Sequence, residues 1–261
     1  MEIKNFETIE FTLVNRVATI TLNRPQAMNA LNDVITSELV TAFEMCKSDE
    51  VKVVVLTGNG KSFCSGGDIK LMTQLETKPN AVNDLLLNLH GLVIEMKNLD
   101  KPIVAKVNGF AFGAGFSLAL ACDLRVGSKS SSYSCAFVNI GLVPDTGASF
   151  FLTKLLGSTK AAELMFLGKT IKAQEAYNLG LLNNIVEDEE LDDTVEKLVT
   201  ELLSKPSGSL SRIKQLINRA IISDLSDQLG LEAMFQREVT KTSDFREGIT
   251  AFIQKRTANF I

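Results

Sequence analysis

Residues 101–123 of this 261-residue chain read KPIVAKVNGFAFGAGFSLALACD, and they contain the clearest indication of its class of fold. The continuous apolar run Ile103–Val107 predicts a buried strand, and the small and apolar residues after Gly113 predict a buried helix. The glycine-rich segment 108–115 joins the two, although it lacks the G-x-G-x-x-G spacing of a dinucleotide site. A buried strand that leads directly into a buried helix is typical of an α/β fold with crossover connections.

The same alternation of strands and helices extends along much of the chain. Strands are also predicted at Ile9–Val14, Val17–Leu22, Val51–Leu56 and Leu124–Val126, and apolar residues at helical spacing predict helices over Asp33–Cys46 and Asn83–Met96. From Leu191 onward the pattern is almost wholly helical, with a break at Pro206 and Gly208. We therefore expect an α/β core over residues 1–200 and a helical C-terminal region over residues 201–261.

The composition excludes several classes of function. The net charge is −4, which argues against a nucleic-acid-binding protein. One histidine, His90, and four cysteines without CxxC spacing argue against a metal site, and we expect reduced thiols. The longest apolar run, 110–122, is too short to span a membrane, and Met1–Lys4 does not resemble a signal peptide, so we expect a cytoplasmic protein without membrane contact.

Two glycine-rich segments are candidates for chemistry. Residues 62–70 read SFCSGGDIK and residues 108–115 read NGFAFGAG, and each precedes a predicted helix start. Unpaired N–H groups at a helix start carry a partial positive charge, so two such junctions could direct two N–H groups at one oxygen atom. The alternatives are an ordinary turn capped by Asp68 and close helix–strand packing. A third segment, GLVPDTG at 141–147, places Asp145 in what composition alone indicates to be a surface turn.

An ordered set of motifs covers essentially the whole chain. Its members are Asn23–Pro25, Met28–Leu31, Phe63–Asp68, Lys101-Pro102, Asn108-Gly109, Gly113–Gly115, Cys122-Asp123, Ala173–Ala176, Gly180–Asn183 and Glu247–Arg256. In this set the chain resembles the crotonase (enoyl-CoA hydratase/isomerase) superfamily. The resemblance implies a spiral of ββα units, a C-terminal helical region used for trimerisation, and a homotrimer or hexamer.

The resemblance also implies an acyl-CoA thioester as substrate, so that coenzyme A is part of the substrate and no separate cofactor is expected. The backbone N–H groups of Gly67 and Ala114 match the family's oxyanion hole, which agrees with the reading of the two glycine junctions. The two glutamates of typical hydratases are matched here by Ser117 and Phe137. Neither residue can activate water or protonate carbon in place of a carboxylate.

The catalytic carboxylate that the resemblance retains is Asp145. Several isomerases of the family have an aspartate at this position, and the pattern is nearest to the enoyl-CoA isomerases and the ring-epoxide phenylacetyl-CoA isomerases. We therefore expect catalysis by Asp145, Gly67 and Ala114, with the double bond of a 3-enoyl-CoA moved to the 2-position. Burial near Phe112, Phe116 and Phe137 is expected to raise the pKa of Asp145. His90 lies in the predicted helix Asn83–Met96, away from every matched motif, so we expect it to be structural.

Further residues match family positions that bind the substrate or its coenzyme A. They are Arg24, Ala27, Met28, Ala30, Ser65, Gly66, Asp68, Ile69, Lys70, Leu71, Met72, Phe112, Gly113, Ser117, Phe137, Phe252 and Lys255. Met28 replaces a basic residue of many relatives. Leu71 and Met72 are equally compatible with the acyl pocket and with the core, and Ser117 with plain helix packing. Phe252 and Lys255 match positions that often reach the nucleotide of a neighbouring subunit.

Three alternative functions remain open at this point. One is a hydratase that works through Asp145 and a water molecule. Another is a ring-epoxide isomerase acting on a phenylacetyl-CoA epoxide, which would share the same catalytic set. The third is a catalytically silent acyl-CoA-binding subunit.

Overall fold

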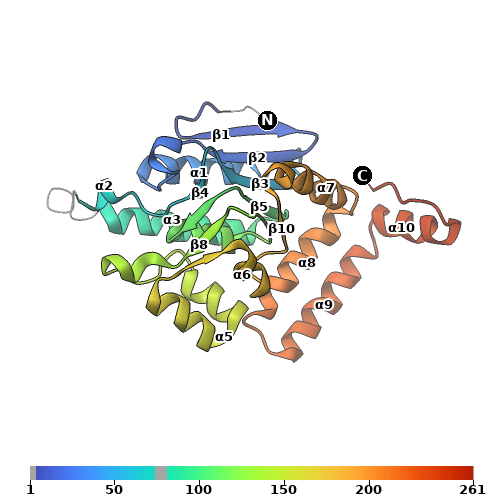
Figure 1. Cartoon of the computed structure of the whole chain (residues 1–261). Coiled ribbons are helices and arrows are strands. Elements are labelled where there is room, and N and C mark those ends of the chain that lie inside the picture. Colours follow the sequence, from blue (N-terminus) through green and yellow to red (C-terminus); the bar gives the residue numbers. More distant parts are fainter. Residues whose placement is uncertain (1–3, 74–80, 261) are drawn as a thin grey trace.

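The computed structural model of the chain describes residues 4–73 and 81–260 (Figure 1). Its strands are β1 Ile9–Val14, β2 Val17–Leu22, β3 Val53–Gly58, β4 Ser62–Cys64, β5 Ile103–Val107, β6 Phe110–Phe112, β7 Leu124–Ser128, β8 Ser132–Ser134, β9 Thr170–Lys172 and β10 Asn184–Val186. Its helices are α1 Asp33–Met45, α2 Ile69–Met72, α3 Ala81–Asn98, α4 Ala114–Ala121, α5 Ala148–Leu167, α6 Ala173–Asn178, α7 Leu191–Leu203, α8 Ser207–Ala220, α9 Leu225–Val239 and α10 Ser243–Gln254.

The strands form two sheets. The first has the order β1-β2-β3-β5-β7-β10, and the second has the order β4-β6-β8-β9. All pairs are parallel except β1 with β2 and β8 with β9. Three times, a strand of the first sheet is followed by a short strand of the second sheet and then by a helix, as in β5–β6–α4. The α/β class and the expected ββα units are therefore confirmed.

The predicted hairpin is confirmed with the predicted bounds. Asn15 and Arg16 have φ angles of +50° and +67°, the left-handed conformation that a two-residue turn needs to match the twist of its strands. The predicted helices and the other predicted strands also occur, with ends that differ by a few residues. Short strands and helix ends are sensitive to their tertiary neighbours, so such differences are expected.

The strands β4 and β6 were not predicted, because they lie inside the segments that we interpreted as glycine-rich turns. Each has three residues, and the two pair with each other in parallel. A Cβ atom on Gly109 would lie 2.0 Å from the carbonyl oxygen of Lys61, so glycine is required where these two chain segments meet. The glycine content thus reflects close backbone packing between distant segments.

The helix α4 is buried along its whole length, and α7 packs against β3, β5 and β7 of the first sheet. Residue 200 lies inside α7, and the nearest interruption between helices is Ser204–Pro206. The predicted break is confirmed at Pro206, which directly precedes α8, whereas Gly208 lies in the first turn of that helix. The division of the chain into two parts at residue 200 stays a prediction.

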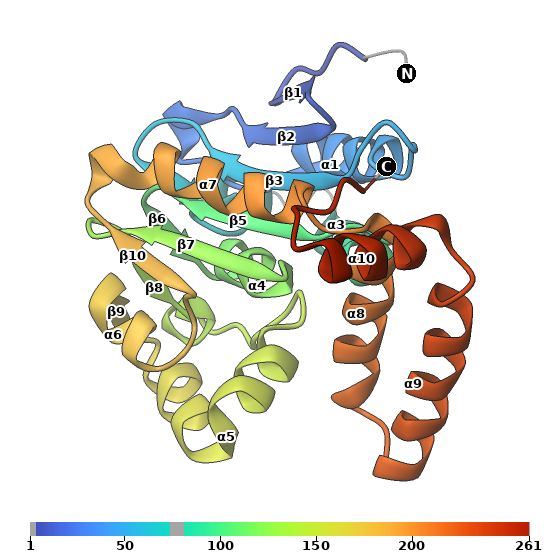
Figure 2. The same ribbon diagram turned by 90° about the vertical axis from the view of Figure 1, so that its right-hand side faces the viewer.

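The C-terminal helices α8, α9 and α10 stand together beside the α/β part of the molecule (Figure 2). Among residues 4–73 and 81–260, no helix combines the length and the apolar character needed to cross a bilayer. The four cysteines are buried and unpaired, and burial raises the pKa of each thiol to about 12. They are therefore unreactive thiols.

Candidate active site

A cavity of about 600 Å³ lies where the two glycine-rich junctions meet. Five parts of the chain contribute its walls: residues 26–30, residues 65–70, the first half of α3, and the segments 112–114 and 136–145. The residues that line it are Gln26, Ala27, Met28, Ala30, Ser65, Gly66, Gly67, Asp68, Ile69, Lys70, Leu85, Leu86, Leu89, Phe112, Gly113, Ala114, Ala136, Phe137, Asn139, Ile140, Leu142, Val143 and Asp145. Most are apolar, as expected for a pocket that holds an organic substrate.

The first junction follows β4. Gly66 has a φ angle of +97°, and a Cβ atom there would lie 2.9 Å from the carbonyl oxygen of Phe112, so only glycine fits. The backbone of Leu31 holds this segment, because its N–H donates to Gly66 O at 2.7 Å and its oxygen accepts from Asp68 N at 2.9 Å. The N–H group of Gly67, which lines the cavity, has no acceptor among the described residues.

The second junction joins β6 to α4. Gly113, with φ +51° and ψ −128°, precedes the helix, and its N–H donates to the carbonyl oxygen of Ser134 at 2.9 Å. Ala114 is the first residue of the helix, and the described part of the chain offers its N–H no acceptor. The two junctions are in contact, since a Cβ on Gly66 would lie 3.5 Å from the nitrogen of Ala114. Two unpaired N–H groups therefore line one cavity at adjoining backbone segments, which is the donor arrangement of an oxyanion site.

Asp145 lies on the loop between the short helical turn Ala136–Ile140 and α5. Its carboxylate oxygen Oδ1 accepts a hydrogen bond from Thr146 Oγ1 at 2.8 Å. Its backbone oxygen accepts from Ala148 N at 2.9 Å and from Ser117 Oγ at 3.1 Å. Both the side chain and the backbone of Asp145 are thus held in place at the cavity wall.

The turn that carries Asp145 has an unusual backbone. Thr146 is fully buried and has a φ angle of +52°, and the next residue, Gly147, has a φ angle of +84°. A β-branched residue in the left-handed region is strained, and such strain costs of the order of 1–3 kcal/mol. Strained residues of this kind are concentrated at functional sites, so the turn is consistent with a role in positioning Asp145.

The surroundings raise the pKa of the Asp145 carboxyl above its ordinary value. Burial is the largest cause, and the hydrogen bond from Thr146 and the charge of His90 act in the opposite direction. The predicted direction is therefore confirmed, with Phe112 and Phe137 beside Asp145 in the cavity, whereas Phe116 packs in the core against Tyr133. His90, which lies away from every matched motif in the sequence, is on α3, and α3 forms one wall of the cavity, so the charge of His90 acts on Asp145.

The other acidic residue of the cavity, Asp68, has a structural role. Its Oδ1 accepts from Lys70 N at 3.0 Å and so caps α2. Its Oδ2 forms an ion pair with Arg24 at 3.0 Å, and Arg24 also donates to the carbonyl oxygen of Ala30. Among the described residues, Asp145 is therefore the one carboxylate that lines the cavity without forming an ion pair.

The structure brings most of the predicted site residues together. The cavity includes Ala27, Met28, Ala30, Ser65, Gly66, Gly67, Asp68, Ile69, Lys70, Phe112, Gly113, Ala114, Phe137 and Asp145. Arg24, Leu71 and Ser117 do not line it: Arg24 supports Asp68, Leu71 belongs to the hydrophobic core, and Ser117 is fully buried behind the wall. The side chain of Met72 lies outside the described residues.

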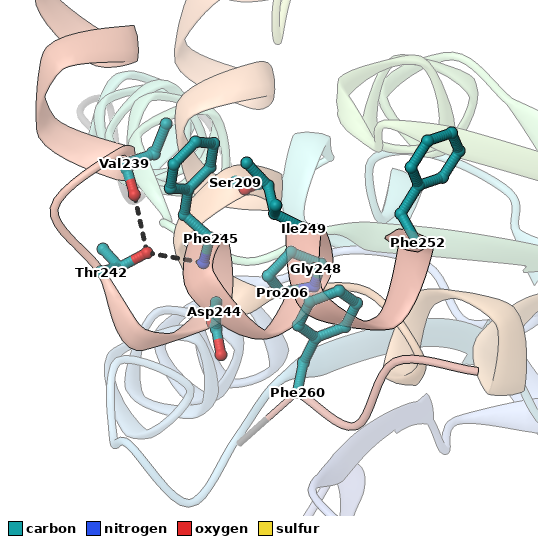
Figure 3. A pocket seen from close by; sticks show the side chains of 10 residues that line it. All are labelled: Pro206, Ser209, Val239, Thr242, Asp244, Phe245, Gly248, Ile249, Phe252 and Phe260. Atoms are coloured by element: carbon teal, nitrogen blue, oxygen red, sulfur yellow. Dashed lines mark hydrogen bonds between the residues drawn. The ribbon is translucent and has the colours of Figure 1, made fainter. Parts of the chain in front are cut away.

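Phe252 and Lys255 lie at the end of α10, outside the cavity. Phe252 is 85% exposed and lines a separate apolar pocket of about 380 Å³, in which Phe245, Ile249 and Phe252 project from successive turns of α10 (Figure 3). Phe260 closes one side of this pocket near Gly248. A single chain therefore does not bring Phe252 and Lys255 to the cavity that holds Asp145.

Several residues of the cavity were not predicted. They are Gln26, Leu85, Leu86, Leu89, Ala136, Asn139, Ile140, Leu142 and Val143. The leucines belong to an apolar stripe at helical spacing, which indicates a buried face but not what that face covers. The segment 136–143 directly precedes Asp145, and this proximity was the one signal that could have identified it.

Comparison with known proteins supports the same assignment. The family model described as enoyl-CoA hydratase/isomerase matches residues 12–261. The chain is 36% identical to the 1,2-epoxyphenylacetyl-CoA isomerase of Escherichia coli over 249 residues, with 94% of both chains covered. It is also 36% identical to the short-chain-enoyl-CoA hydratase of Clostridium acetobutylicum over 243 residues, with 92% of both covered.

A solved structure agrees with these relationships. The crystal structure of an enoyl-CoA hydratase from a Polaromonas species has a TM-score of 0.93 and 32% identity, and the match covers 97% of this chain and 99% of the other. The match therefore includes the two sheets, the glycine junctions and the C-terminal helices. With its fold, its pair of free N–H groups and its family match in agreement, the chain belongs to the enoyl-CoA hydratase/isomerase family of enzymes.

Proposed function

We propose that the protein is an enoyl-CoA isomerase that moves the double bond of a 3-enoyl-CoA to the 2-position. The observation that carries this proposal is Asp145, the single carboxylate without an ion pair that lines the cavity in the described part of the chain. Addition of water to an enoyl-CoA needs one group to activate water and another to protonate carbon. A 1,3-shift of a proton needs one group only, because the base that removes the proton can return it elsewhere.

The proposed reaction begins with Asp145 as a base. Its carboxylate removes a proton from C2 of the 3-enoyl thioester, and the electron pair of that C–H bond moves toward the thioester oxygen. The N–H groups of Gly67 and Ala114 stabilise the resulting dienolate. The protonated Asp145 then donates the same proton to C4, and the double bond forms between C2 and C3. A raised pKa of Asp145 supports the first step, since it makes the carboxylate a better base.

The apolar lining supports the assignment of the acyl group to this cavity. Leu85, Leu89 and Phe137 would contact the chain, and the exposed Lys70 stands at the wall as a cation that can face the phosphates of coenzyme A. No separate cofactor is proposed. The buried, reduced thiols support our proposal that the enzyme acts in the cytoplasm.

The proposal is tested by comparing substrates. Purified protein is incubated with a 3-enoyl-CoA and, separately, with crotonyl-CoA, and the conjugated enoyl thioester is followed by its absorbance. We expect the absorbance to rise with the first substrate and to remain constant with the second. Loss of absorbance from crotonyl-CoA would indicate a hydratase, and tight binding of coenzyme A without turnover of either substrate would indicate a silent binding subunit.

A ring-epoxide isomerase is a second candidate. It is favoured by the 36% identity to the Escherichia coli 1,2-epoxyphenylacetyl-CoA isomerase. The proposed catalytic set is the same, so the two activities differ in the acyl group that the cavity accepts. Parallel assays with a 3-enoyl-CoA and with the epoxide of phenylacetyl-CoA distinguish them, and a higher kcat/KM for the epoxide would favour this candidate.

The hydroxyl of Thr146 is expected to set the pH range in which Asp145 acts as a base. Thr146→Val keeps the shape of the side chain but removes the hydrogen bond to Asp145 Oδ1. In the wild type this hydrogen bond lowers the pKa of the Asp145 carboxyl, so its removal raises that pKa. The acid limb of the kcat/KM profile should therefore move to higher pH, with a loss of about tenfold in activity on that limb. Thr170→Val, at an exposed position of β9, is the matched control. An unchanged pH profile in a folded Thr146→Val protein would contradict this role.

We also propose that the protein is a homotrimer, alone or as a pair of trimers. Phe252 and Ile253 are 85% and 73% exposed at the end of α10, and exposed apolar groups of this kind are typical of an interface. Phe252→Asp is expected to convert the oligomer into smaller species, as measured by light scattering after size-exclusion chromatography. Val14→Asp, which replaces an exposed apolar residue of β1, is the control. Trimers that persist in the Phe252→Asp protein would exclude Phe252 from the interface.

A further inference from the structure

A second cavity of about 600 Å³ lies between the turn that joins β1 to β2, the loop 98–102 and the beginning of α8. Among the described residues, it has no lining residue in common with the cavity that holds Asp145. Its lining includes five basic side chains and two acidic ones, in contrast to the net negative charge of the whole chain. Three features of this cavity indicate an anionic ligand.

The first feature is Lys52. Lys52 is one of the residues that line the cavity, yet it is only 4% exposed. Within residues 4–73 and 81–260, its ammonium group has neither a hydrogen bond nor an ion pair, although its backbone N–H donates to Arg16 O at 2.7 Å. Burial and the charge of Arg16 lower the pKa of Lys52, and Asp244 is the acidic residue that acts against them. An unpaired buried charge is unfavourable, so the site lacks a negative group.

The second feature is the beginning of α8, a helix of 14 residues. The residue before it is Pro206, whose side chain cannot cap the helix, and the first hydrogen bond runs from Leu210 N to Pro206 O at 3.1 Å. The N–H groups of the first turn therefore keep their partial positive charge, which favours an anion. Gly208 lies in this turn and leaves open space beside the backbone.

The third feature is the hydroxyl of Ser207, the first residue of α8. Its Oγ is buried and has no hydrogen-bond partner in the described structure, and Ser207 lines the same cavity as Lys52. Buried polar atoms are nearly always satisfied, so a hydroxyl and an ammonium group that both lack a partner and belong to residues lining the same cavity point to a partner that both share. Either group alone is explained by local packing, but both in one cavity are not.

The other charged groups of the cavity do not form an ion pair with the ammonium group of Lys52 in the described structure. Lys47 pairs with Glu44 and Glu95, and Arg212 pairs with Glu238. Of the two acidic residues, Asp100 accepts hydrogen bonds from Ser211 and Gln215. The negative charge of Asp49 acts on the ammonium group of Lys101, whose pKa it raises. The Lys101 ammonium donates to the carbonyl oxygens of Lys47 and Ser48 at 2.7 and 3.0 Å. None of these contacts brings an acidic group to Lys52 within ion-pair distance among the described residues.

We propose that this cavity is a second binding site, which holds the phosphate group of a small ligand. The ammonium group of Lys52, the hydroxyl of Ser207 and the N–H groups of the first turn of α8 donate hydrogen bonds to the phosphate oxygens. The charge of Arg16 adds to the attraction. A phosphate group fits this donor set because it offers several oxygens with a charge near −2 at neutral pH. The volume of the cavity exceeds that of the phosphate group, so the ligand can be a phosphate ester as well as the free ion.

The test measures binding to the full-length oligomer by isothermal titration calorimetry. Inorganic phosphate and adenosine monophosphate are titrated separately, which distinguishes the free ion from an ester. We expect saturable binding of at least one of them, weakened by added sodium chloride. Lys52→Met should weaken binding by at least about tenfold, because it removes a buried charged donor. Lys197→Met removes an exposed lysine from α7 and should leave binding unchanged.

Ser207→Ala provides a second variant in case Lys52→Met fails to fold. It removes a hydroxyl that has no partner in the described structure, so it should fold normally and weaken phosphate binding by a factor of about three to ten. The proposal is overturned if the wild-type protein binds neither probe. It is also overturned if the folded Lys52→Met and Ser207→Ala proteins both bind as the wild type does, which would assign these groups to packing alone. Neither result depends on whether the enzyme is an isomerase.

Discussion

Asp145→Asn is expected to lower kcat for a 3-enoyl-CoA by about 10²- to 10⁴-fold, the range found for loss of a general acid–base group. The amide keeps the size of the side chain and can still accept the hydrogen bond from Thr146, so the change removes little except basicity. The measurement is the initial rate of absorbance increase with saturating substrate. Because no second carboxylate without a basic partner lines the cavity in the described residues, we expect no residual acid–base catalysis.

The control for Asp145→Asn is Asp193→Asn, which makes the same chemical change at an exposed position of α7. It should retain full activity. Full isomerase activity in the Asp145→Asn protein would exclude Asp145 as the base and would return the choice of function to the alternatives.

The stability of the Asp145→Asn protein is a check that its fold is intact. The pKa of Asp145 is raised in the folded state, so the folded chain binds more protons than the unfolded chain between the two pKa values. The free energy of unfolding of the wild type therefore falls as the pH rises through this interval. An amide does not titrate, so at pH 7 the variant should be as stable as the wild type or more stable. Chemical denaturation at pH 7 and at lower pH, where this difference should disappear, measures the effect.

Ala114→Pro is expected to lower kcat by about 10²- to 10³-fold, because it removes one of the two N–H groups that we propose to stabilise the dienolate oxygen. Proline is normally disruptive in a helix, but Ala114 is the first residue of α4, where its N–H has no acceptor within the helix and proline is well tolerated. The substitution therefore removes a donor while the helix itself is preserved. The measurement is kcat with saturating 3-enoyl-CoA.

Leu225→Pro is the matched control, because it places proline at the first residue of α9, far along the chain from either glycine junction. Circular dichroism and the melting temperature establish that both variants are folded. If Ala114→Pro is folded and still has at least half of the wild-type kcat, the N–H of Ala114 does not stabilise the reaction intermediate.

Local patterns were sufficient for much of the fold. The continuous apolar runs predicted β3, β5 and β7, and the helical spacing after Asp33 predicted α1. They failed for β4 and β6, which have three residues each and exist because they pair with each other. A strand of this length has too few residues for a periodic pattern, so its identity depends on a partner that is distant in the sequence.

The candidate site shows the same division. The types of residue at Gly66, Gly113 and Asp145 could be interpreted from the sequence and from its resemblance to a family, since close backbone approach and proton transfer each demand particular residues. The role of His90 could not, because its effect on Asp145 arises only when α3 packs beside the loop 136–145. The same is true of Ser117, whose hydroxyl supports Asp145 across 28 residues of sequence.

The motifs of this chain and their resemblance to a family therefore predicted an α/β enzyme with an oxyanion site and one catalytic carboxylate. Only the tertiary structure could place that carboxylate in an apolar cavity. Only it could bring Lys52 and Ser207 to the lining of another cavity, where neither side chain has a partner among the described residues. The physical reason is that a residue's chemistry belongs to its side chain, whereas its burial, hydrogen bonds and charge environment come from residues far away in the sequence.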